Sequence, residues 1–180
     1  TVLKGLRALG LEAEATGLAP HGIRVKERLS LARLKGLKTG EIEIQDEGSQ
    51  LVALLVGARP GEQVVDFCAG AGGKTLALAR ACGVSGHVLA TDVRDDALAE
   101  LRRRAERAGL RQIATARPAR GDAQTFDGVL VDAPCSGLGA MRRKPDVARR
   151  VDQAMLDRLP AQQYAIAREA LRWLKPDGLL

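Results

Sequence analysis

Strand-like and helix-like patterns alternate along residues 40–180. Short runs rich in β-branched residues, such as 63–67 and 127–131, have the length of buried strands. Between them, apolar residues recur every three or four positions. In 95–108 they form one stripe beside an arginine-rich face, and Gly109 ends the pattern. This alternation predicts an α/β fold with a doubly wound parallel sheet.

The expected elements follow from these patterns. Strands are predicted at 41–44, 63–67, 87–93, 112–116 and 127–131, and helices at 49–55, 76–81, 95–108 and 155–174. Asp46 or Ser49 is available to cap the first of these helices. Lys175–Gly178 predicts a turn that ends the last helix. Gly178–Leu180 predicts the opening of a fifth core strand, with 63–67 counted as the first.

Residues 1–39 do not share this alternation. Residues 2–9 have the apolar spacing of a helix that ends at Gly10, and 22–25 is suited to a short strand. Residues 29–37 mix apolar and basic positions irregularly. We therefore expect a small N-terminal appendage, with a boundary near residue 40.

A glycine-rich turn, Asp66–Thr75, joins the strand ending at residue 67 to the next helix. Glycines at such a junction let the backbone approach a ligand closely. A Walker phosphate loop needs two glycines separated by four other residues, the second directly before the lysine, and this turn lacks that spacing. The dinucleotide fingerprint also fits poorly, because Lys74 follows Gly73 directly. The acid and the Cys-Ala pair point instead to a methyl-donor site.

Three motifs in order resemble the Sun/Fmu family of RNA cytosine-5 methyltransferases, in its bacterial ribosomal RNA type. They are the lead-in 45–50, the turn 66–75, and 132–139 followed by 142–146. The visible departure is Gly70-Ala71, where the family commonly has Ala-Pro. The resemblance implies a Rossmann-like class I S-adenosylmethionine-dependent methyltransferase fold.

The same resemblance implies a division of the chain. Residues 40–180 would be the catalytic domain, and residues 1–39 the tail of an N-terminal subdomain that binds RNA or only packs; the sequence leaves both open. Methyltransferase sheets usually have seven strands. We therefore expect the sheet to be C-terminally incomplete, truncated before its last strands.

Acids at strand ends are the candidates for binding S-adenosylmethionine. Asp92 lies about twenty residues beyond the glycines, where such folds accept the ribose hydroxyls. The resemblance assigns Asp122 to the adenine amine and Asp132 to the methionine ammonium. Asp66 is expected to fasten the loop. The residues expected around the methionine part are Cys68, Ala69, Gly70, Ala71, Gly72, Gly73 and Lys74.

Cys135 is the candidate catalytic residue. Carbon-5 of cytosine becomes nucleophilic after a thiolate adds to carbon-6, and a thiolate needs electropositive surroundings. Cys135 lies in a Pro-Cys-Ser-Gly turn, and Arg142, Arg143 and Lys144 follow. That is the setting of an activated thiol, and these three cations are expected to bind RNA phosphates. Lys74 is expected either to orient the catalytic loop or to touch phosphate.

The role of Cys135 depends on the enzyme class. In DNA cytosine methyltransferases the Pro-Cys cysteine is the nucleophile. In the Sun/Fmu family it helps release the product, and a later Thr-Cys cysteine attacks. The motifs favour the RNA class, so Cys135 is assigned to elimination, the nucleophile is expected beyond Leu180, and this chain is expected to bind cofactor without completing turnover. A DNA enzyme and a non-catalytic cofactor- or RNA-binding fragment stay as alternatives. Asp132–Cys135 argues against an oxidoreductase.

Composition agrees with this interpretation. A net charge of +6 over 180 residues favours a polyanionic partner. The resemblance implies that this partner is RNA, above all ribosomal RNA. Aromatic residues make up 2%, which argues against a base-stacking platform. No apolar run approaches the length of a membrane span, and the three cysteines lack disulfide or zinc spacing. We expect a cytoplasmic protein without metal or membrane contact; the oligomeric state stays open.

Overall fold

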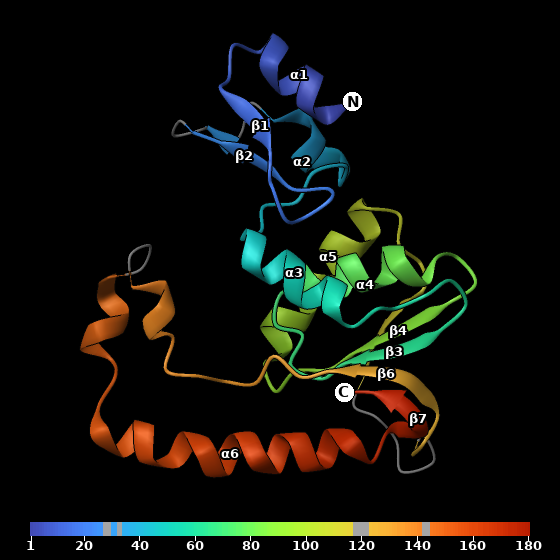
Figure 1. Ribbon diagram of the computed structural model, residues 1–180, viewed down its shortest axis with the longest axis vertical. Helices are drawn as coiled ribbons and strands as arrows, with labels where there is room; N and C mark the ends of the chain where they lie inside the picture. The colour runs from blue at the N-terminus through green and yellow to red at the C-terminus, as the bar shows by residue number, and fades with distance from the viewer. Residues whose placement is uncertain (27–29, 32–33, 117–122, 142–144) are drawn as a thin grey trace.

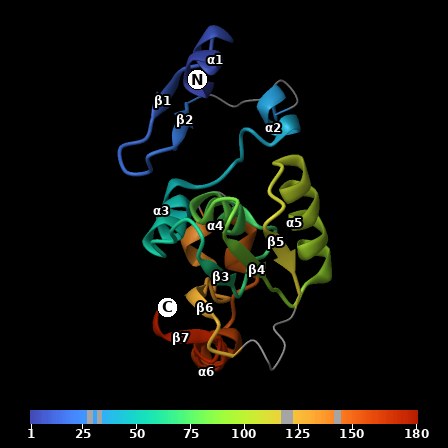
Figure 2. The same ribbon diagram turned by 90° about the vertical axis from the view of Figure 1, so that its right-hand side faces the viewer.

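The computed structural model describes residues 1–26, 30–31, 34–116, 123–141 and 145–180. A small unit sits above a larger α/β unit (Figure 1), and the turned view shows the same stacking (Figure 2). The small unit consists of α1 (Val2–Ala8), β1 (Ala13–Ala15), β2 (Ile23–Val25) and α2 (Lys35–Thr39). Its two strands pair antiparallel, and Leu6, Ala13 and Leu34 form its buried core.

The larger unit is built on a five-stranded sheet in which every pair of neighbouring strands is parallel. Its strands are β3 (Gln63–Asp66), β4 (His87–Ala90), β5 (Ile113–Thr115), β6 (Phe126–Leu130) and β7 (Leu174–Leu179). The order across the sheet is β5-β4-β3-β6-β7. The direction of winding therefore reverses between β3 and β6, and sheets of this kind bind ligands at the carboxyl ends of the strands at that point.

Helices cover both faces of the sheet, as a parallel sheet requires. They are α3 (Glu47–Leu55), α4 (Gly73–Cys82), α5 (Asp95–Arg107) and α6 (Gln153–Leu171), with 3-10 turns at Leu138–Ala140 and Pro145–Arg149. On one face Leu78 of α4 packs against Val64 and Val88. On the other, Ala170 at the end of α6 and Trp173 pack against Val65 and Phe126. In Figure 1, α3, α4 and α5 lie above the sheet and α6 below it.

The apolar stripe predicted for 95–108 is buried in α5, through Ala97, Leu98, Leu101 and Ala105. Leu101 is fully buried, and burial of a leucine side chain stabilises the fold by about 2 kcal/mol. Gly72 lies directly on it: a Cβ added at Gly72 would be 2.5 Å from Leu101 Cγ. Gly72 also has φ +87°, a left-handed conformation that favours glycine. The glycine loop and α5 therefore fit each other only without a side chain at residue 72.

The strand predicted at 41–44 is wrong. These residues form an irregular link between α2 and α3. The alternation that imitated a strand reflects two different contacts: the Glu43 carboxylate accepts hydrogen bonds from Arg104 and Arg107 of α5, whereas Ile42 packs against Gly36.

The turn predicted at Lys175–Gly178 is also wrong, because these residues belong to β7. The fifth strand therefore begins at Leu174, before the position expected for it, and α6 ends earlier, at Leu171. Proline has no N–H to donate and is tolerated in edge strands and bulges. Pro176 lies in such a place: β7 is at the edge of the described sheet, and its register against β6 shifts between Phe126 and Gly128.

The N-terminus of α3 joins the small unit to the larger one. Asp46 caps this helix by accepting the amide of Gly48, so of the two expected caps Asp46 is the one used. Glu47 accepts hydrogen bonds from the amides of Leu18 and Ala19 and from the Arg24 guanidinium. The hydrogen bond from the Leu18 amide is the main cause that lowers the pKa of Glu47. One carboxylate thus connects the small unit to α3. The domain boundary near residue 40 stays a prediction.

Candidate functional site

Two aspartates mark the carboxyl ends of the strands where the winding reverses. Asp66 is the last residue of β3, and Asp132 follows β6. Lys74, in the first turn of α4, forms an ion pair with Asp132: its Nζ lies 2.5 Å from Asp132 Oδ2. The Lys74 side chain is 16% exposed and that of Asp132 54%. A charged pair therefore spans the switch point, and Asp132 keeps part of its carboxylate open to a ligand.

The glycine loop, residues 67–72, is held by hydrogen bonds from several elements. The Ala69 amide donates to Thr91 O at 2.9 Å, and the Gly70 amide donates to Asp92 Oδ2 at 2.8 Å. Asp92 Oδ1 accepts from the backbone amide and Nε of Arg94. Burial raises the pKa of Asp92, but the amides of Arg94 and Gly70 outweigh it and lower the pKa overall. Asp92 is thus an ionised carboxylate fixed beside the loop.

Arg104 supports the loop from α5. Its Nη1 donates to the Ala71 carbonyl at 2.5 Å, and its Nε and Nη2 donate to Glu43 Oε2 at 3.2 and 2.8 Å. Because a guanidinium holds its donors in a fixed fork, one side chain sets the spacing between the loop and the α2–α3 link.

Asp66 is buried, with only 1% of its surface exposed. Its Oδ2 accepts from the Thr75 hydroxyl at 2.7 Å, which ties β3 to α4 and agrees with the fastening role expected of this residue. Its Oδ1 has no hydrogen-bond partner among the described residues. Burial raises the pKa of Asp66 to about 6, against the opposing hydrogen bond from Thr75 and the charge of Lys74.

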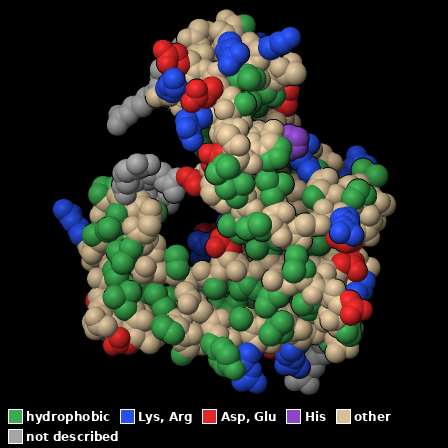
Figure 3. Space-filling model, in the orientation of Figure 1, with side chains coloured by type: hydrophobic (Ala, Val, Ile, Leu, Met, Phe, Trp, Pro, Cys, Tyr) green, Lys and Arg blue, Asp and Glu red, His purple; other side chains and the backbone are tan. Residues whose placement is uncertain are grey.

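A polar cavity of about 150 Å³ lies between these groups. Its walls are Gln45, Ser49, Asp66, Cys68, Ala69, Gly73, Lys74 and Asp132. Five residues predicted for the cofactor therefore share one cavity, whereas Gly70, Ala71, Gly72 and Asp92 lie outside its lining. Figure 3 shows a hollow lined by acidic and basic side chains, between the main body and the arm formed by α6 and the chain before it.

Gln45 and Ser49 were missed as site residues. Their motif, 45–50, resembled the family lead-in, but no chemical role was assigned to it. The signal was a pair of polar side chains four residues apart at the start of a helix. Only the fold shows that this turn faces the glycine loop across the cavity.

Cys68 forms part of the wall and is half-buried. Burial, together with the negative charges of Asp92, Asp66 and Asp132, raises its pKa to about 11. Cys68 is therefore a neutral thiol near pH 7, unsuited to nucleophilic attack. Cys82, expected to be a small buried hydrophobe, is fully buried against the sheet.

Cys135 is exposed, three residues beyond Asp132. It belongs to the Pro-Cys segment, residues 131–141, which α6 contacts through a hydrogen bond from Gln163 Nε2 to Pro134 O at 2.9 Å. The thiol does not line the polar cavity. Other predicted site residues lie outside the described part of the chain: Asp122, Arg142, Arg143 and Lys144.

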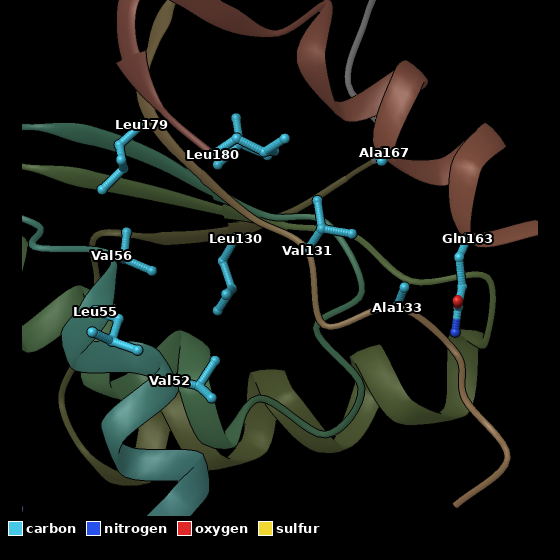
Figure 4. A pocket seen from close by; sticks show the side chains of 11 residues that line it. Val52, Leu55, Val56, Leu130, Val131, Ala133, Gln163, Ala167, Leu179 and Leu180 are labelled. Carbon is cyan, nitrogen blue, oxygen red and sulfur yellow. The ribbon is translucent and has the colours of Figure 1, made fainter. Parts of the chain in front are cut away.

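A second cavity, of about 520 Å³, is apolar (Figure 4). Val52 and Leu55 of α3, with Val56 directly after it, face Leu130 and Leu179 across it, and Gln163 of α6 lies at one end. Within the described residues, no group of three or more His, Cys, Asp or Glu side chains is placed to hold a metal ion. No helix in the described part of the chain has both the length and the apolar character needed to cross a bilayer.

The fold and the site together define a class of protein. A parallel sheet with a glycine loop after β3 and an acid beyond β4 is the architecture of the Rossmann-like, S-adenosylmethionine-dependent methyltransferases. Within this class, the sequence model of the family described as 16S rRNA methyltransferase RsmB/F matches residues 53–180, and the chain belongs to that family. This confirms the resemblance to the Sun/Fmu family.

Individual proteins show the same relationship. The chain is 39% identical over 150 residues to ribosomal RNA small subunit methyltransferase B of Pseudomonas syringae pv. tomato, a match that covers 81% of this chain and 34% of that protein. The chain spans only about a third of this relative's length. The crystal structure of PH0851 superposes with a TM-score of 0.93 at 26% identity and covers 99% of this chain and 42% of that one. The structure of a methyltransferase homolog from Pyrococcus horikoshii superposes with a TM-score of 0.77 at 28% identity and covers 99% of this chain and 58% of that one.

Proposed function

We propose that this chain binds S-adenosylmethionine and serves in the methylation of carbon-5 of cytosine in RNA, with small-subunit ribosomal RNA as substrate and the cytoplasm as its location. Family membership and the name of the Pseudomonas relative support this proposal. The observation that carries it is the polar cavity at the switch point, which joins the glycine loop to Asp132, three residues before an exposed Cys135.

The residues present fit the cofactor. The ammonium of its methionine part needs acceptors, and the orphaned Asp66 Oδ1 is one at the edge of the cavity. Asp92 is ionised and fixed beside Gly70, as a ribose-binding acid should be. When bound, S-adenosylmethionine supplies an electrophilic methyl group. A whole ligand of this size occupies about 300 Å³ or more, so the cavity of about 150 Å³ takes only one end of it.

Lys74 and Asp132 would position the reacting groups. Of the two roles expected for Lys74, its ion pair with Asp132 supports the orienting one. Asp132 lies at the start of the Pro-Cys segment, so its fixed carboxylate sets where that segment leaves the sheet.

Cys135 would act after methyl transfer. Once carbon-5 carries the methyl group, its proton must leave and the carbon–sulfur bond at carbon-6 must break, which restores the aromatic ring. We assign Cys135 to this release step, because the motifs around it are those of the RNA class. The alternative is a DNA-type mechanism in which Cys135 itself attacks carbon-6.

Calorimetry on this chain tests the cofactor. We expect S-adenosylmethionine and S-adenosylhomocysteine to bind and NAD not to bind; binding of NAD alone would overturn the proposal. Methylation is tested with ribosomal RNA and radiolabelled cofactor. Methylated cytosine formed by this chain alone would assign the nucleophile to Cys135 and reject the release role.

RNA containing 5-azacytidine separates the two roles of Cys135 directly, because a cysteine that attacks carbon-6 becomes trapped as a covalent adduct. We expect no adduct through Cys135. An adduct that is lost in Cys135→Ser would show that Cys135 is the nucleophile.

The three cations outside the described part of the chain keep their predicted role. If Arg142, Arg143 and Lys144 bind phosphates, RNA affinity should fall steeply with salt, and neutralising all three should reduce the salt slope. An unchanged slope would contradict this role.

A further inference from the structure

We propose that Gln45 and Ser49 form the subsite for the amino-acid end of S-adenosylmethionine. In this subsite the Gln45 side-chain oxygen accepts from the ammonium, and the Ser49 hydroxyl donates to the carboxylate. The inference deepens the proposed function and rests on it. It concerns residues at the start of α3, which line the same cavity as the charged pair of Lys74 and Asp132.

Gln45 is held over the start of α4. A Cβ added at Gly73 would lie 3.5 Å from Gln45 Nε2 and 3.8 Å from its Cδ, so the amide rests against a bare glycine. The Gln50 side chain donates to the Gln45 backbone carbonyl at 3.4 Å, and Asp46 fixes the helix cap that follows. The Gln45 amide is therefore placed at the cavity wall by its own turn and by the absence of a side chain at residue 73.

The hydrogen bond between the two residues decides which donor and which acceptor are left for a ligand. Gln45 Nε2 donates to Ser49 Oγ at 3.1 Å. A side-chain amide that uses its nitrogen here presents its oxygen, an acceptor, to the cavity, and a hydroxyl that accepts here still has its hydrogen to donate. One acceptor and one donor next to each other match the ammonium and carboxylate of a free amino-acid end.

Asp66 supplies an independent sign that a cation binds here. Its Oδ1 is buried at the cavity and has no partner among the described residues, and an unsatisfied buried acceptor is costly to the fold. An ammonium in the cavity would satisfy it. Asp132, which was expected to face the ammonium, has one oxygen already committed to Lys74. Asp66 and Gln45 therefore join Asp132, whose second oxygen stays open, as acceptors for the ammonium in this subsite.

The size of the cavity agrees with this assignment. About 150 Å³ holds one end of the cofactor, and Asp92, beside which the ribose is expected, does not line this cavity. The amino-acid end is the part of the molecule that carries two opposite charges, and it meets paired polar groups in this cavity.

Binding measurements with cofactor fragments test the subsite. We expect the chain to bind S-adenosylmethionine more tightly than 5′-methylthioadenosine, which lacks the amino-acid end. Gln45→Ala and Ser49→Ala should each weaken S-adenosylmethionine binding about tenfold, the effect of losing a hydrogen bond to a charged group. Both should leave methylthioadenosine affinity unchanged, which also shows that the variants are folded. Gln153→Ala, a glutamine change at the far α6 N-terminus, is the matched control.

Decarboxylated S-adenosylmethionine distinguishes the two roles. It keeps the ammonium and lacks the carboxylate, so Ser49→Ala should no longer weaken its binding, whereas Gln45→Ala still should. Variants that weaken all ligands equally, or none, would overturn the subsite while leaving the proposed function intact. Failure of the unmodified chain to bind S-adenosylmethionine would instead reject the proposed function.

Discussion

The glycine loop and the Pro-Cys segment, both next to the switch point, are held very differently. Over six residues the loop receives four hydrogen bonds from other elements, through Phe67, Ala69, Gly70 and Ala71. Over eleven residues the described Pro-Cys segment is hydrogen-bonded to other elements at two places, where Lys74 donates to Asp132 and Gln163 donates to Pro134. The loop after β3 is therefore fixed by more hydrogen bonds than the segment after β6. In the proposed function, preorganised cofactor binding and adaptable substrate contact would follow different strands.

A glycine substitution in each region gives the largest contrast. Gly72→Ala combines a left-handed backbone with a collision at Leu101, and we expect it to lower the free energy of unfolding by about 4 kcal/mol. Gly139→Ala, in the Pro-Cys segment, meets nothing within 4 Å of the added Cβ and should change it little. Urea unfolding of both variants measures the difference. Equal effects would show that the loop is not more tightly fitted than the segment.

Asp66 gives the loop a pH dependence. Because its folded pKa, about 6, is above its ordinary value of 3.8, its contribution favours the folded state fully below pH 4 and is lost as pH rises through 6. As the pH rises from 4 to 7, we expect the free energy of unfolding of Asp66→Asn to increase by up to about 3 kcal/mol relative to that of the unmodified chain. Denaturant unfolding at several pH values measures this gain.

Asp127→Asn is the control for this titration. Hydrogen bonds from Lys175 and the Gln63 amide lower the pKa of Asp127, so its stabilisation is present above its ordinary pKa and lost at lower pH. With rising pH, the stability of Asp127→Asn relative to the unmodified chain should therefore change in the direction opposite to that of Asp66→Asn. A flat difference for Asp66→Asn would contradict the burial of an acid at the end of β3.

Arg104 tests the support of the loop from α5. Arg104→Met removes the donor to the Ala71 carbonyl and should weaken S-adenosylmethionine binding about tenfold. Arg103→Met, on the same helix, removes only an exposed pair with Glu100 and should leave binding unchanged. Calorimetry on both variants gives the comparison, and equal affinities would show that Arg104 does not shape the cofactor site.

Cys135 should produce the smallest effect. Its thiol is exposed, and substitutions of exposed side chains usually change stability by less than about 0.5 kcal/mol. Cys135→Ser should therefore leave both unfolding and S-adenosylmethionine affinity unchanged. A loss of cofactor affinity, measured by calorimetry, would show that the Pro-Cys segment and the glycine loop are coupled rather than separate.

The sequence predicted the sheet well where local pattern and burial agree. The stripe of α5 was identified residue by residue, because a helix that packs on one face must repeat its apolar positions. Prediction from the sequence failed where a local signal competed with a tertiary contact. The Pro-Asp-Gly run that normally turns the chain lies in an edge strand, and the alternation of 41–44 came from an ion pair with α5.

The site was predicted in part for the same reason. Cys68, Ala69, Gly73, Lys74 and Asp132 were named from motifs, and they share one cavity. Ser49 is separated by 17 positions from Asp66, the next residue of the cavity along the chain, and the packing of α3 against α4 brings the two parts together. A motif can be recognised before its partners in space are known.

The Glu47 contact described above has a mechanical consequence. Glu47 lies between Gln45 and Ser49 along the same turn. Its carboxylate accepts hydrogen bonds from Leu18, Ala19 and Arg24 of the small unit. A force on the small unit would therefore act on the turn that lines the polar cavity. A partner that docks on the N-terminal unit would be coupled, through Glu47, to the subsite proposed for the cofactor.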